Sequence, residues 1–300
     1  MCRNWALLLA MAVGGLGSSA AAQTSAAEAL ATLADPGSQR ILVIAHRSCW
    51  QKAPENSLAG VHACERMGVD GVELDVRHTR DGHAVIIHDD TVDRTTNGHG
   101  KVAEMTWAQL AALRLKERGG GPDAALTNEL VPTLAQYLRA ARKRLLIVFD
   151  VKDWSQASTF AAISREGMEK QAIFFYECNN DRLLNNVRAF RDRVAMFPIM
   201  FEKDGPLETG LQRCRSNPAN WAHVKFQTTE WLDHAKKVSA QQGLRLWTAT
   251  MFPEDNAGLD DARAAREPDV AWGRQIASGA RLIMTNTPQE LMNYLHEKRR

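Results

Sequence analysis

Nine short apolar runs are the feature that most constrains the fold of this chain. They are rich in Val, Ile, Leu and Phe and alternate with amphipathic stretches, a pattern typical of a parallel sheet covered by helices. The predicted strands are residues 41–47, 71–76, 84–88, 145–151, 172–177, 194–200, 223–227, 244–250 and 281–285. This is one strand more than an eight-stranded parallel barrel contains.

The pair Asp81-Gly82 accounts for the extra strand. An Asp-Gly pair between two extended runs is a strong hairpin signal, so 84–88 should fold back antiparallel on 71–76. The other strands predict an α/β chain with a TIM-type (β/α)8 barrel, which needs about 250 residues. An open doubly wound sheet is the alternative, but no glycine-rich phosphate turn follows the predicted strands.

Residues at helix boundaries agree with this alternation of strands and helices. Asn56 is the expected N-cap of a helix over 57–67, and Gly68 is placed to end it. Thr287 and Pro288 mark the start of the last helix.

The first 22 residues are expected to be a cleavable export signal. Arg3 supplies positive charge, an apolar run covers 5–13, and small residues at 20–22 suit cleavage. This run is shorter than the about 20 residues that span a bilayer, so no stable membrane anchor is expected. The sequence therefore predicts a periplasmic or secreted protein.

One domain is expected behind the export signal. Residues 23–39 are rich in Ala, Ser and Thr and should form a flexible leader, and 40–300 should form the domain, with an insertion at about 89–130. Charge is nearly balanced, 37 Lys plus Arg against 35 Asp plus Glu. We therefore expect a small-molecule substrate rather than nucleic acid, and the sequence leaves the oligomeric state open.

Four cysteines remain once Cys2 leaves with the export signal: Cys49, Cys64, Cys178 and Cys214. Their wide spacing contains no Cys-x-x-Cys pair, so a zinc or dithiol redox site is not expected. Buried thiols are the favoured interpretation. Disulfides in an oxidising compartment, with three possible connectivities, are the alternative.

Acidic residues alternate on the second predicted strand. Glu73 and Asp75 point to one side of it, and the positions between and beside them are apolar. The carboxylates should therefore face the barrel axis, where unpaired charge is costly. A bound cation would relieve that cost, and ion pairs with inward Lys or Arg are the alternative.

Two histidines are expected beside these carboxylates. A hairpin symmetric about the Asp-Gly turn would set Asp75 opposite His88 and Glu73 opposite Asp90. His46 ends the first strand and should open into the same mouth, where the carboxyl ends of barrel strands collect. Two histidines beside a metal suit phosphodiester hydrolysis, since one can accept a proton from the attacking oxygen while the other protonates the leaving oxygen.

A third alternating pair, Asp150 and Lys152, ends the predicted strand 145–151. Asp150 can complete a carboxylate set for a metal, and Lys152 with Arg47 can neutralise phosphate oxygens. The alternatives are structural: Lys152 paired with Asp150 alone, and Arg47 bridging the barrel rim.

The motifs that contain these residues resemble the glycerophosphodiester phosphodiesterase family in order and spacing. The resemblance is dense from residue 41 to about 152 and thinner toward the C-terminus. It rests on Ala45-His46-Arg47, Pro54-Glu55-Asn56-Ser57, Gly71-Val72-Glu73-Leu74-Asp75-Val76, Thr79-Arg80-Asp81-Gly82, His88-Asp89, Asp93-Arg94-Thr95-Thr96-Asn97-Gly98, Val131-Pro132-Thr133-Leu134, Asp150-Val151-Lys152 and Trp247-Thr248.

This resemblance implies a TIM-type barrel with one divalent cation, Mg²⁺ or Ca²⁺, and hydrolysis of glycerophosphodiesters to glycerol 3-phosphate and an alcohol. The residues it implies are His46 and His88 for acid-base catalysis, Glu73, Asp75 and Asp150 for the metal, Arg47 and Lys152 for the phosphate, and Glu55 as a support of the site. Trp247 is expected either as a wall for the glycerol or as a core residue.

Two positions depart from the family pattern. Ser48 stands where Gly usually follows His-Arg, so a side chain there would narrow the approach of the phosphate. Asp150 stands where Glu is usual, so this ligand is one methylene shorter.

Two other functions are open to such a chain. A lysophospholipase D or another phospholipase-like enzyme would need an apolar rim for an acyl chain, and residues 110–115 are only modestly apolar. A catalytically silent binding protein of the same fold is the second. Retention of both histidines and all the acidic ligands disfavours it.

Overall fold

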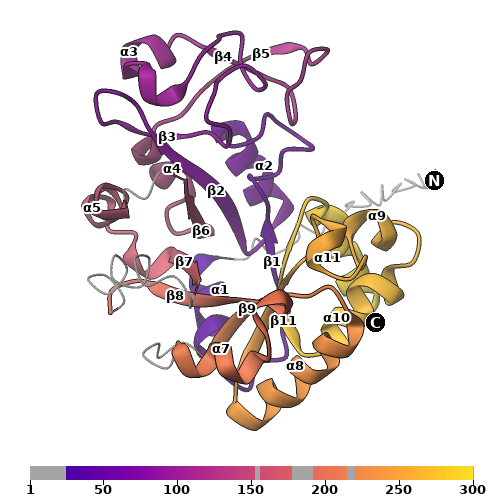
Figure 1. The fold of residues 1–300 in the computed structure, drawn as a ribbon. Helices are drawn as coiled ribbons and strands as arrows, with labels where there is room; N and C mark the ends of the chain where they lie inside the picture. The colour runs from indigo at the N-terminus through magenta and orange to yellow at the C-terminus, as the bar shows by residue number, and fades with distance from the viewer. Residues whose placement is uncertain (1–24, 153–155, 178–191, 215–219, 300) are drawn as a thin grey trace, which may run out of the picture.

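Eight parallel strands close into a barrel in the computed structural model, which describes residues 25–152, 156–177, 192–214 and 220–299 (Figure 1). The strands are β1 (Leu42–Ala45), β2 (Gly71–His78), β6 (Leu146–Val151), β7 (Ala172–Glu177), β8 (Ala195–Phe201), β9 (Trp221–Lys225), β10 (Arg245–Ala249) and β11 (Ala280–Thr285). They pair in chain order, and β1 pairs with both β11 and β2, which closes the ring. The predicted TIM-type barrel is confirmed.

Helices cover the outside of the barrel and leave two apolar layers. They are α2 (Leu58–Met67), α4 (Leu134–Ala141), α5 (Gln156–Glu166), α7 (Leu207–Arg213), α8 (Thr229–Gln242), α9 (Asp261–Ala264), α10 (Arg274–Ala277) and α11 (Pro288–Glu297). Short 3-10 turns are η1 (Val102–Glu104), η2 (Glu169–Gln171), η3 (Glu202–Asp204) and η4 (Pro253–Asp255), and η5 (Asp269–Gly273) is a π-helix. The larger core lies between strands and helices, and a smaller one fills the barrel interior.

The hairpin forms as predicted, but its register differs by one residue. β3 (Ala84–Ile86) runs antiparallel to β2, with Val76 opposite Ile86. The connection is a three-residue loop closed by Thr79, with Gly82 in the left-handed region at φ 81°. A three-residue loop of this kind ends in a left-handed glycine. The two strands therefore pair symmetrically about the middle residue of the loop, and not about the centre of the Asp-Gly pair.

This shift overturns the predicted cross-strand partners. The amide of Ile87, not His88, bonds to the carbonyl of Asp75, at 3.0 Å. Asp75 is therefore not paired with His88, and Glu73 is not paired with Asp90. The chain leaves β3 after Ile86, which frees the following residues to turn into the barrel mouth.

The described part of 23–39 is not the flexible leader that was predicted. Residues Ala26–Ala34 form helix α1, which starts at the Ser25 N-cap and buries Ala29 against the interior core of the barrel. The Arg245 guanidinium, at the start of β10, donates to the carbonyl oxygens of Thr32 (2.7 Å) and Asp35 (2.8 Å). Helix α1 thus covers the end of the barrel where the strands begin.

The start of α2 also differs from the prediction. Ser57, not Asn56, is the N-cap and accepts from the amide of Gly60 at 3.0 Å. Gly68 ends the helix in the left-handed conformation as expected, at φ 80°. At the last helix, Thr287 is the N-cap, but its side chain makes no capping hydrogen bond.

The segment predicted as an insertion, 89–130, forms a small unit with its own core. It contains η1, α3 (Trp107–Leu110) and the antiparallel pair β4 (Arg114–Lys116) and β5 (Leu126–Leu130), at the top of Figure 1. Leu110 and Leu115 are buried in this core together with residues of the hairpin. Their side chains therefore form no apolar rim at the mouth.

A disulfide links Cys49 to Cys64, so the expectation of free thiols is wrong for this pair. It joins the loop after β1 to helix α2, and the two cysteines are 15 residues apart in sequence. Constraining a loop of this length stabilises a fold by about 3 kcal/mol. Cys214 is disulfide-bonded as well, and Cys178 lies outside the described residues.

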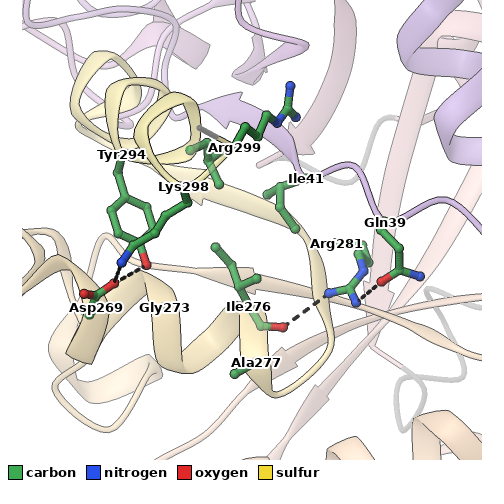
Figure 2. A pocket seen from close by; sticks show the side chains of 11 residues that line it. Gln39, Ile41, Asp269, Gly273, Ile276, Ala277, Arg281, Tyr294, Lys298 and Arg299 are labelled. Carbon is green, nitrogen blue, oxygen red and sulfur yellow. Dashed lines mark hydrogen bonds and ion pairs between the residues drawn. The ribbon is translucent and has the colours of Figure 1, made fainter.

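A pocket opens on the outer wall, near the start of β1 and β11 (Figure 2). Three of its charged groups are already engaged: Lys298 pairs with Asp269 at 2.7 Å, and Arg281 donates to the carbonyl of Ile276 at 3.3 Å. It lies at the opposite end from the predicted site. Among the described residues, no helix is long and apolar enough to span a bilayer.

Gly71 is expected to be required for the tight contact of β2 with its two neighbours. A Cβ at this position would lie 2.7 Å from Ile44 Cδ1 and 2.8 Å from the Leu146 carbonyl oxygen. Gly71→Ala should therefore lower the free energy of unfolding by about 1–3 kcal/mol in urea denaturation. The surface control Gly37→Ala should change it by less than about 0.5 kcal/mol; equal effects of the two would show that β2 accommodates a side chain here.

Candidate active site

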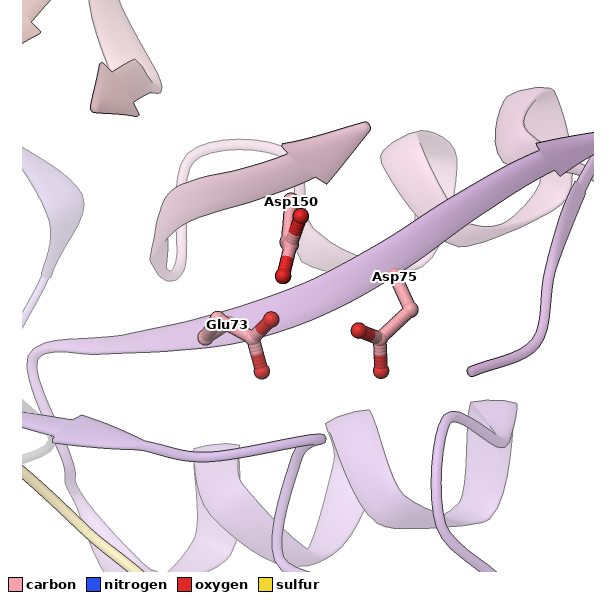
Figure 3. Close-up of side chains that lie close together, drawn as sticks. All are labelled: Glu73, Asp75 and Asp150. Atoms are coloured by element: carbon pink, nitrogen blue, oxygen red, sulfur yellow. The ribbon is translucent and has the colours of Figure 1, made fainter. Parts of the chain in front are cut away.

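Carboxylates from two neighbouring strands meet at the mouth of the barrel (Figure 3). Glu73 and Asp75 on β2 and Asp150 on β6 each place an oxygen within 4.8 Å of the others. The β2–β6 register sets Asp75 directly beside Asp150, and Glu73 and Asp75 are almost fully buried. The predicted inward direction of both acids on β2 is confirmed, because Val72, Leu74 and Val76 lie in the outer core.

Lys152 is the cation that lies within this cluster. Its Nζ is 2.5 Å from Asp150 Oδ2 and 3.0 Å from Asp75 Oδ1, so it joins both strands rather than Asp150 alone. These two carboxylates hold the pKa of Lys152 above its usual value, against the effect of burial. Asp150 reaches the cluster in spite of its shorter side chain.

Carboxylates outnumber the neighbouring cations in this cluster, and the effect is largest at Glu73. Burial and the neighbouring Asp75 and Asp150 raise the pKa of Glu73 well above its usual value. Lys152, His88 and Arg47 instead hold the pKa of Asp75 low, although burial opposes them. Carboxylate oxygens are the ligands that hard divalent cations prefer, and a cation here would offset the like-charge repulsion. The residues present therefore fit a metal ion.

His46 lies beside Glu73, between a carboxylate and an amide. Its Nε2 is 3.8 Å from Glu73 Oε2, and its Nδ1 is 2.8 Å from Asn286 Oδ1. Burial and the positive Arg47 lower the pKa of His46 to about 4, so the ring is neutral near pH 7.

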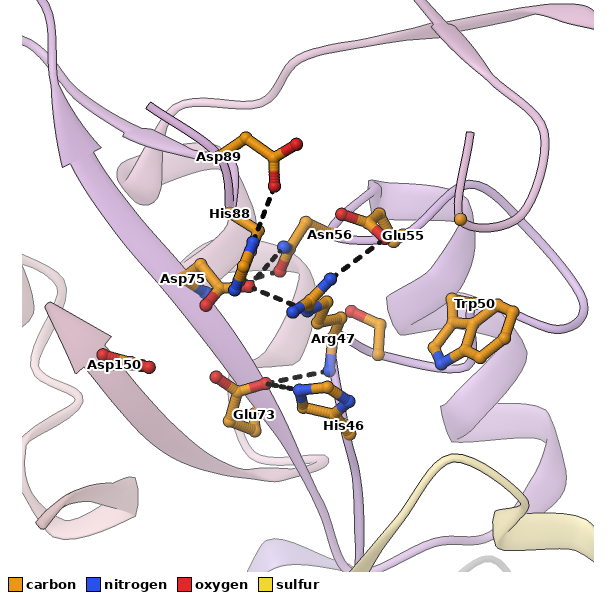
Figure 4. Close-up of polar contacts among 12 residues, drawn as sticks. His46, Arg47, Trp50, Glu55, Asn56, Glu73, Asp75, His88, Asp89 and Asp150 are labelled. Carbon is orange, nitrogen blue, oxygen red and sulfur yellow. Dashed lines mark hydrogen bonds and ion pairs between the residues drawn. The ribbon is translucent and has the colours of Figure 1, made fainter. Parts of the chain in front are cut away.

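His88 is held by a carboxylate, Asp89, from the adjacent position in the chain. His88 Nδ1 lies 2.7 Å from Asp89 Oδ1, and Arg94 Nε lies 2.7 Å from Asp89 Oδ2. The hydrogen bond from Arg94 lowers the pKa of Asp89 far below its usual range, so this carboxylate stays ionised. Figure 4 shows the His88 ring beside Asp75 and the His46 ring beside Glu73.

Arg47 lies between these two histidines and is supported by Glu55 (Figure 4). Its Nε is 3.5 Å from Asp75 Oδ2, and its Nη1 is 3.4 Å from Glu55 Oε2. Glu55 is buried and also accepts two hydrogen bonds from Arg94, of 2.9 and 2.7 Å. Glu55 thus supports the site from behind Arg47, while Arg94 connects it to the insertion.

The loop after β1 takes a strained backbone to bring these groups in. Arg47, Ser48 and Asn56 have positive φ values of 49°, 65° and 58°. Few non-glycine residues adopt this conformation, and they cluster at functional sites. It directs the Arg47 amide to Glu73 Oε2 at 2.9 Å and the Asn56 side-chain amide to Asp75 Oδ2 at 2.8 Å. Asn56 therefore orients Asp75 instead of capping the helix.

Ser48 does not narrow the approach to the site. Its side chain is buried, and its hydroxyl makes a hydrogen bond with the Tyr137 hydroxyl of α4. The Ser48 side chain, at the position where the family usually has Gly, thus points outward from the barrel into the layer under α4.

Trp247 forms no wall for a substrate, so of its two predicted roles the structure shows the core one. Its side chain is 0% exposed and stacks on His223 inside the barrel, with ring centroids 4.1 Å apart. The other predicted site residues lie together at the barrel mouth. Trp247 lies apart from them, in the barrel interior.

Four residues that support the site were not assigned to it from the sequence. Asp89 holds His88, Arg94 holds Asp89 and Glu55, Asn286 holds His46, and Asn56 holds Asp75. Arg94 and Asn56 lie in motifs that support the family resemblance, which marks them without stating their contacts. Asn286 lies in no such motif, and its role depends on the closure of the barrel.

Comparisons with known proteins place the chain by similarity of sequence. Residues 46–179 match the glycerophosphoryl diester phosphodiesterase family model, and 196–295 match a model described as a domain of unknown function. YhdW of Bacillus subtilis, assigned by its name to the glycerophosphodiester phosphodiesterases, is 31% identical over 189 residues, which cover 61% of this chain and 75% of that protein. The Caldanaerobacter subterraneus glycerophosphodiester phosphodiesterase is 40% identical over 114 residues, or 38% of this chain. The chain covers only 46% of that relative's own length.

Solved structures show the same fold. A glycerophosphoryl diester phosphodiesterase from Parabacteroides distasonis superposes with a TM-score of 0.72 at 22% identity, covering 92% of this chain and 93% of that one. A phosphodiesterase from Oleispira antarctica, solved in complex with its product sn-glycerol-3-phosphate, gives a TM-score of 0.62 at 20% identity, with coverages of 85% and 96%.

A divalent cation is expected to stabilise the folded chain through Glu73. Millimolar Mg²⁺ or Ca²⁺ should raise the melting temperature, because an ion that binds only the native state shifts the folding equilibrium. Glu73→Gln should remove this shift and raise the melting temperature in chelator, since it removes a buried charge. The exposed control Glu104→Gln should retain the response; an unaltered response of Glu73→Gln would contradict the metal site.

Proposed function

Because the chain belongs to the glycerophosphodiester phosphodiesterase family, we propose that it hydrolyses glycerophosphodiesters to glycerol 3-phosphate and an alcohol. The observation that carries the proposal is the set of two imidazoles, clustered carboxylates and two cations that share one barrel mouth. The product bound to the Oleispira protein supports the substrate class.

The residues that would hold the cation are Glu73, Asp75 and Asp150, and the ion is Mg²⁺ or Ca²⁺. When bound, it supplies positive charge that stabilises the oxygens of the phosphate in the transition state. Arg47 and Lys152 add fixed cationic groups next to the carboxylates, where they orient the phosphate.

The two histidines differ in the partner that holds each ring, and this difference supports a separate role for each. Asn286 offers His46 a neutral oxygen, so His46 accepts the proton of the attacking oxygen. Asp89 offers His88 an ionised carboxylate, which holds Nδ1 and orients the ring, and His88 donates a proton to the leaving oxygen. Water and the neighbouring hydroxyl of the substrate both suit the attacking position.

Exposed apolar surface near His46 bears on the lipid alternative. Phe252 is 41% exposed, and its ring centroid lies 6.1 Å from that of His46. A single ring does not make the apolar rim that an acyl chain needs, so we place glycerophosphodiesters before lysolipids as substrates.

Hydrolysis is expected to require both the cation and His88. Purified protein with Mg²⁺ or Ca²⁺ should convert glycerophosphocholine or glycerophosphoethanolamine to glycerol 3-phosphate. The product can be measured by ³¹P NMR. His88→Ala should reduce kcat by about 10²-fold or more, the size of a general acid-base contribution. The surface control His234→Ala should retain activity.

Assays with a chelator test the role of the metal, and assays with a lipid substrate test the substrate class. Activity that survives EDTA would rule out the metal role. Cleavage of lysophosphatidylcholine without cleavage of either glycerophosphodiester would reject the substrate class and leave the phosphodiesterase chemistry in place.

Export is a further part of the proposal, resting on residues 1–22 and on the Cys49–Cys64 disulfide. Structural disulfides persist in oxidising compartments and are rare in the cytosol of mesophiles. Expression of the full chain in a Gram-negative host should yield periplasmic protein whose mass begins at Gln23, whereas a variant lacking 2–22 should stay in the cytoplasm. Cytoplasmic protein that keeps Met1 would overturn this prediction.

A further inference from the structure

One side-chain oxygen, Asn286 Oδ1, contacts two rings at the edge of the site. It lies 2.8 Å from His46 Nδ1 and 3.0 Å from the indole Nε1 of Trp50. Asn286 follows the last strand of the barrel, 240 residues from His46 in sequence. Trp50 comes from the strained loop after β1, so the contact joins the first and last strands at the mouth.

Trp50 determines the orientation of the side-chain amide of Asn286. An indole N–H can only donate a hydrogen bond, so the atom of Asn286 that faces Trp50 must be an acceptor. That atom is Oδ1, and the same oxygen faces His46 Nδ1. An amide oxygen cannot donate, so Nδ1 must carry the proton of the neutral ring.

The backbone of Asn286 is fixed by a buried carboxylate. Asp261, on α9, accepts from the Asn286 amide at 2.8 Å through Oδ2. Its Oδ1 accepts from the hydroxyls of Thr250 at 2.5 Å and Thr285 at 2.6 Å. Through the Asp261 carboxylate, these bonds tie the backbone of Asn286 to the ends of β10 and β11.

We propose that Asn286 is a positioning residue that fixes the tautomer of His46, with Trp50 and Asp261 fixing Asn286 in turn. Nδ1 of His46 then carries the proton, and Nε2 presents a lone pair. Nε2 is the nitrogen on the side of the carboxylate cluster, 3.8 Å from Glu73 Oε2. The use of this lone pair to accept a proton from the attacking oxygen rests on the proposed function.

The tautomer can be measured without any reaction. Long-range ¹H–¹⁵N correlation spectra distinguish protonated from bare ring nitrogens, and loss of one set of signals in His46→Gln assigns His46. In the chelated wild-type protein, Nδ1 should be protonated and Nε2 bare. Asn286→Leu keeps the shape of the side chain but removes the acceptor, so the ring should become a mixture of tautomers.

Two further variants test the separate links. Trp50→Phe keeps a ring but removes the donor that orients the amide, so it should also give a tautomer mixture. Asn286→Asp keeps an acceptor oxygen for both rings and should keep the wild-type tautomer. Asn293→Leu, an exposed asparagine on α11, is the matched control and should leave the spectrum unchanged.

Kinetics should follow the tautomer. Asn286→Leu should lower kcat by about 10²-fold with KM within about threefold, because a wrongly protonated imidazole loses general-base function. Asn286→Asp should recover kcat to within about tenfold of the wild type. A protonated Nε2 in the wild type, or an unchanged tautomer in both Asn286→Leu and Trp50→Phe, would overturn the inference.

The two readouts separate this inference from the proposed function. Tautomers that behave as stated in a protein that cleaves no glycerophosphodiester would leave the inference standing and reject the function. If the protein cleaves glycerophosphodiesters but its Asn286→Leu variant keeps both the tautomer and kcat, the function stands and the inference about Asn286 is rejected.

Discussion

The constraint on which the site depends is the burial of like charges on one strand. Glu73 and Asp75 point into a barrel interior whose lower layers are apolar, and Asp150 adds a third carboxylate beside them. Without compensation, such a set is among the costliest arrangements in a protein. Lys152 and Arg47 offset part of the charge, and the polar residues of the mouth can be understood as the surroundings that make the carboxylates tolerable.

Sequence reasoning found the strands and the inward acids because both follow from local alternation. Apolar runs locate strands, and the period of two directs Glu73 and Asp75 to one face. The hairpin register failed by one residue, because an Asp-Gly pair fits both a two-residue and a three-residue loop. Helix α1 was missed since its alanines carry little bulk, and its attachment depends on Arg245, which lies far away in sequence.

Interactions between distant segments account for the other errors. Trp247 lies at a strand position that serves equally well as a core residue or as a wall, and only the packing against His223 decides it. Asn56 resembles a helix cap, but its side chain turns to Asp75: the amide nitrogen donates to the carboxylate, and the amide oxygen accepts from the backbone N–H. Asn286 reaches His46 across 240 residues, a contact that only closure of the barrel creates.

The insertion has its own core, as an exchangeable loop would, yet two contacts tie it to the site. Arg94 holds both Asp89 and Glu55, and the carbonyl of Arg118 accepts from the Glu55 amide at 2.8 Å. The orientation of His88 and Arg47 is thereby set from outside the barrel. In evolutionary terms, this loop cannot be swapped for that of a relative as an independent module, because its replacement would have to carry the same arginine to the same place.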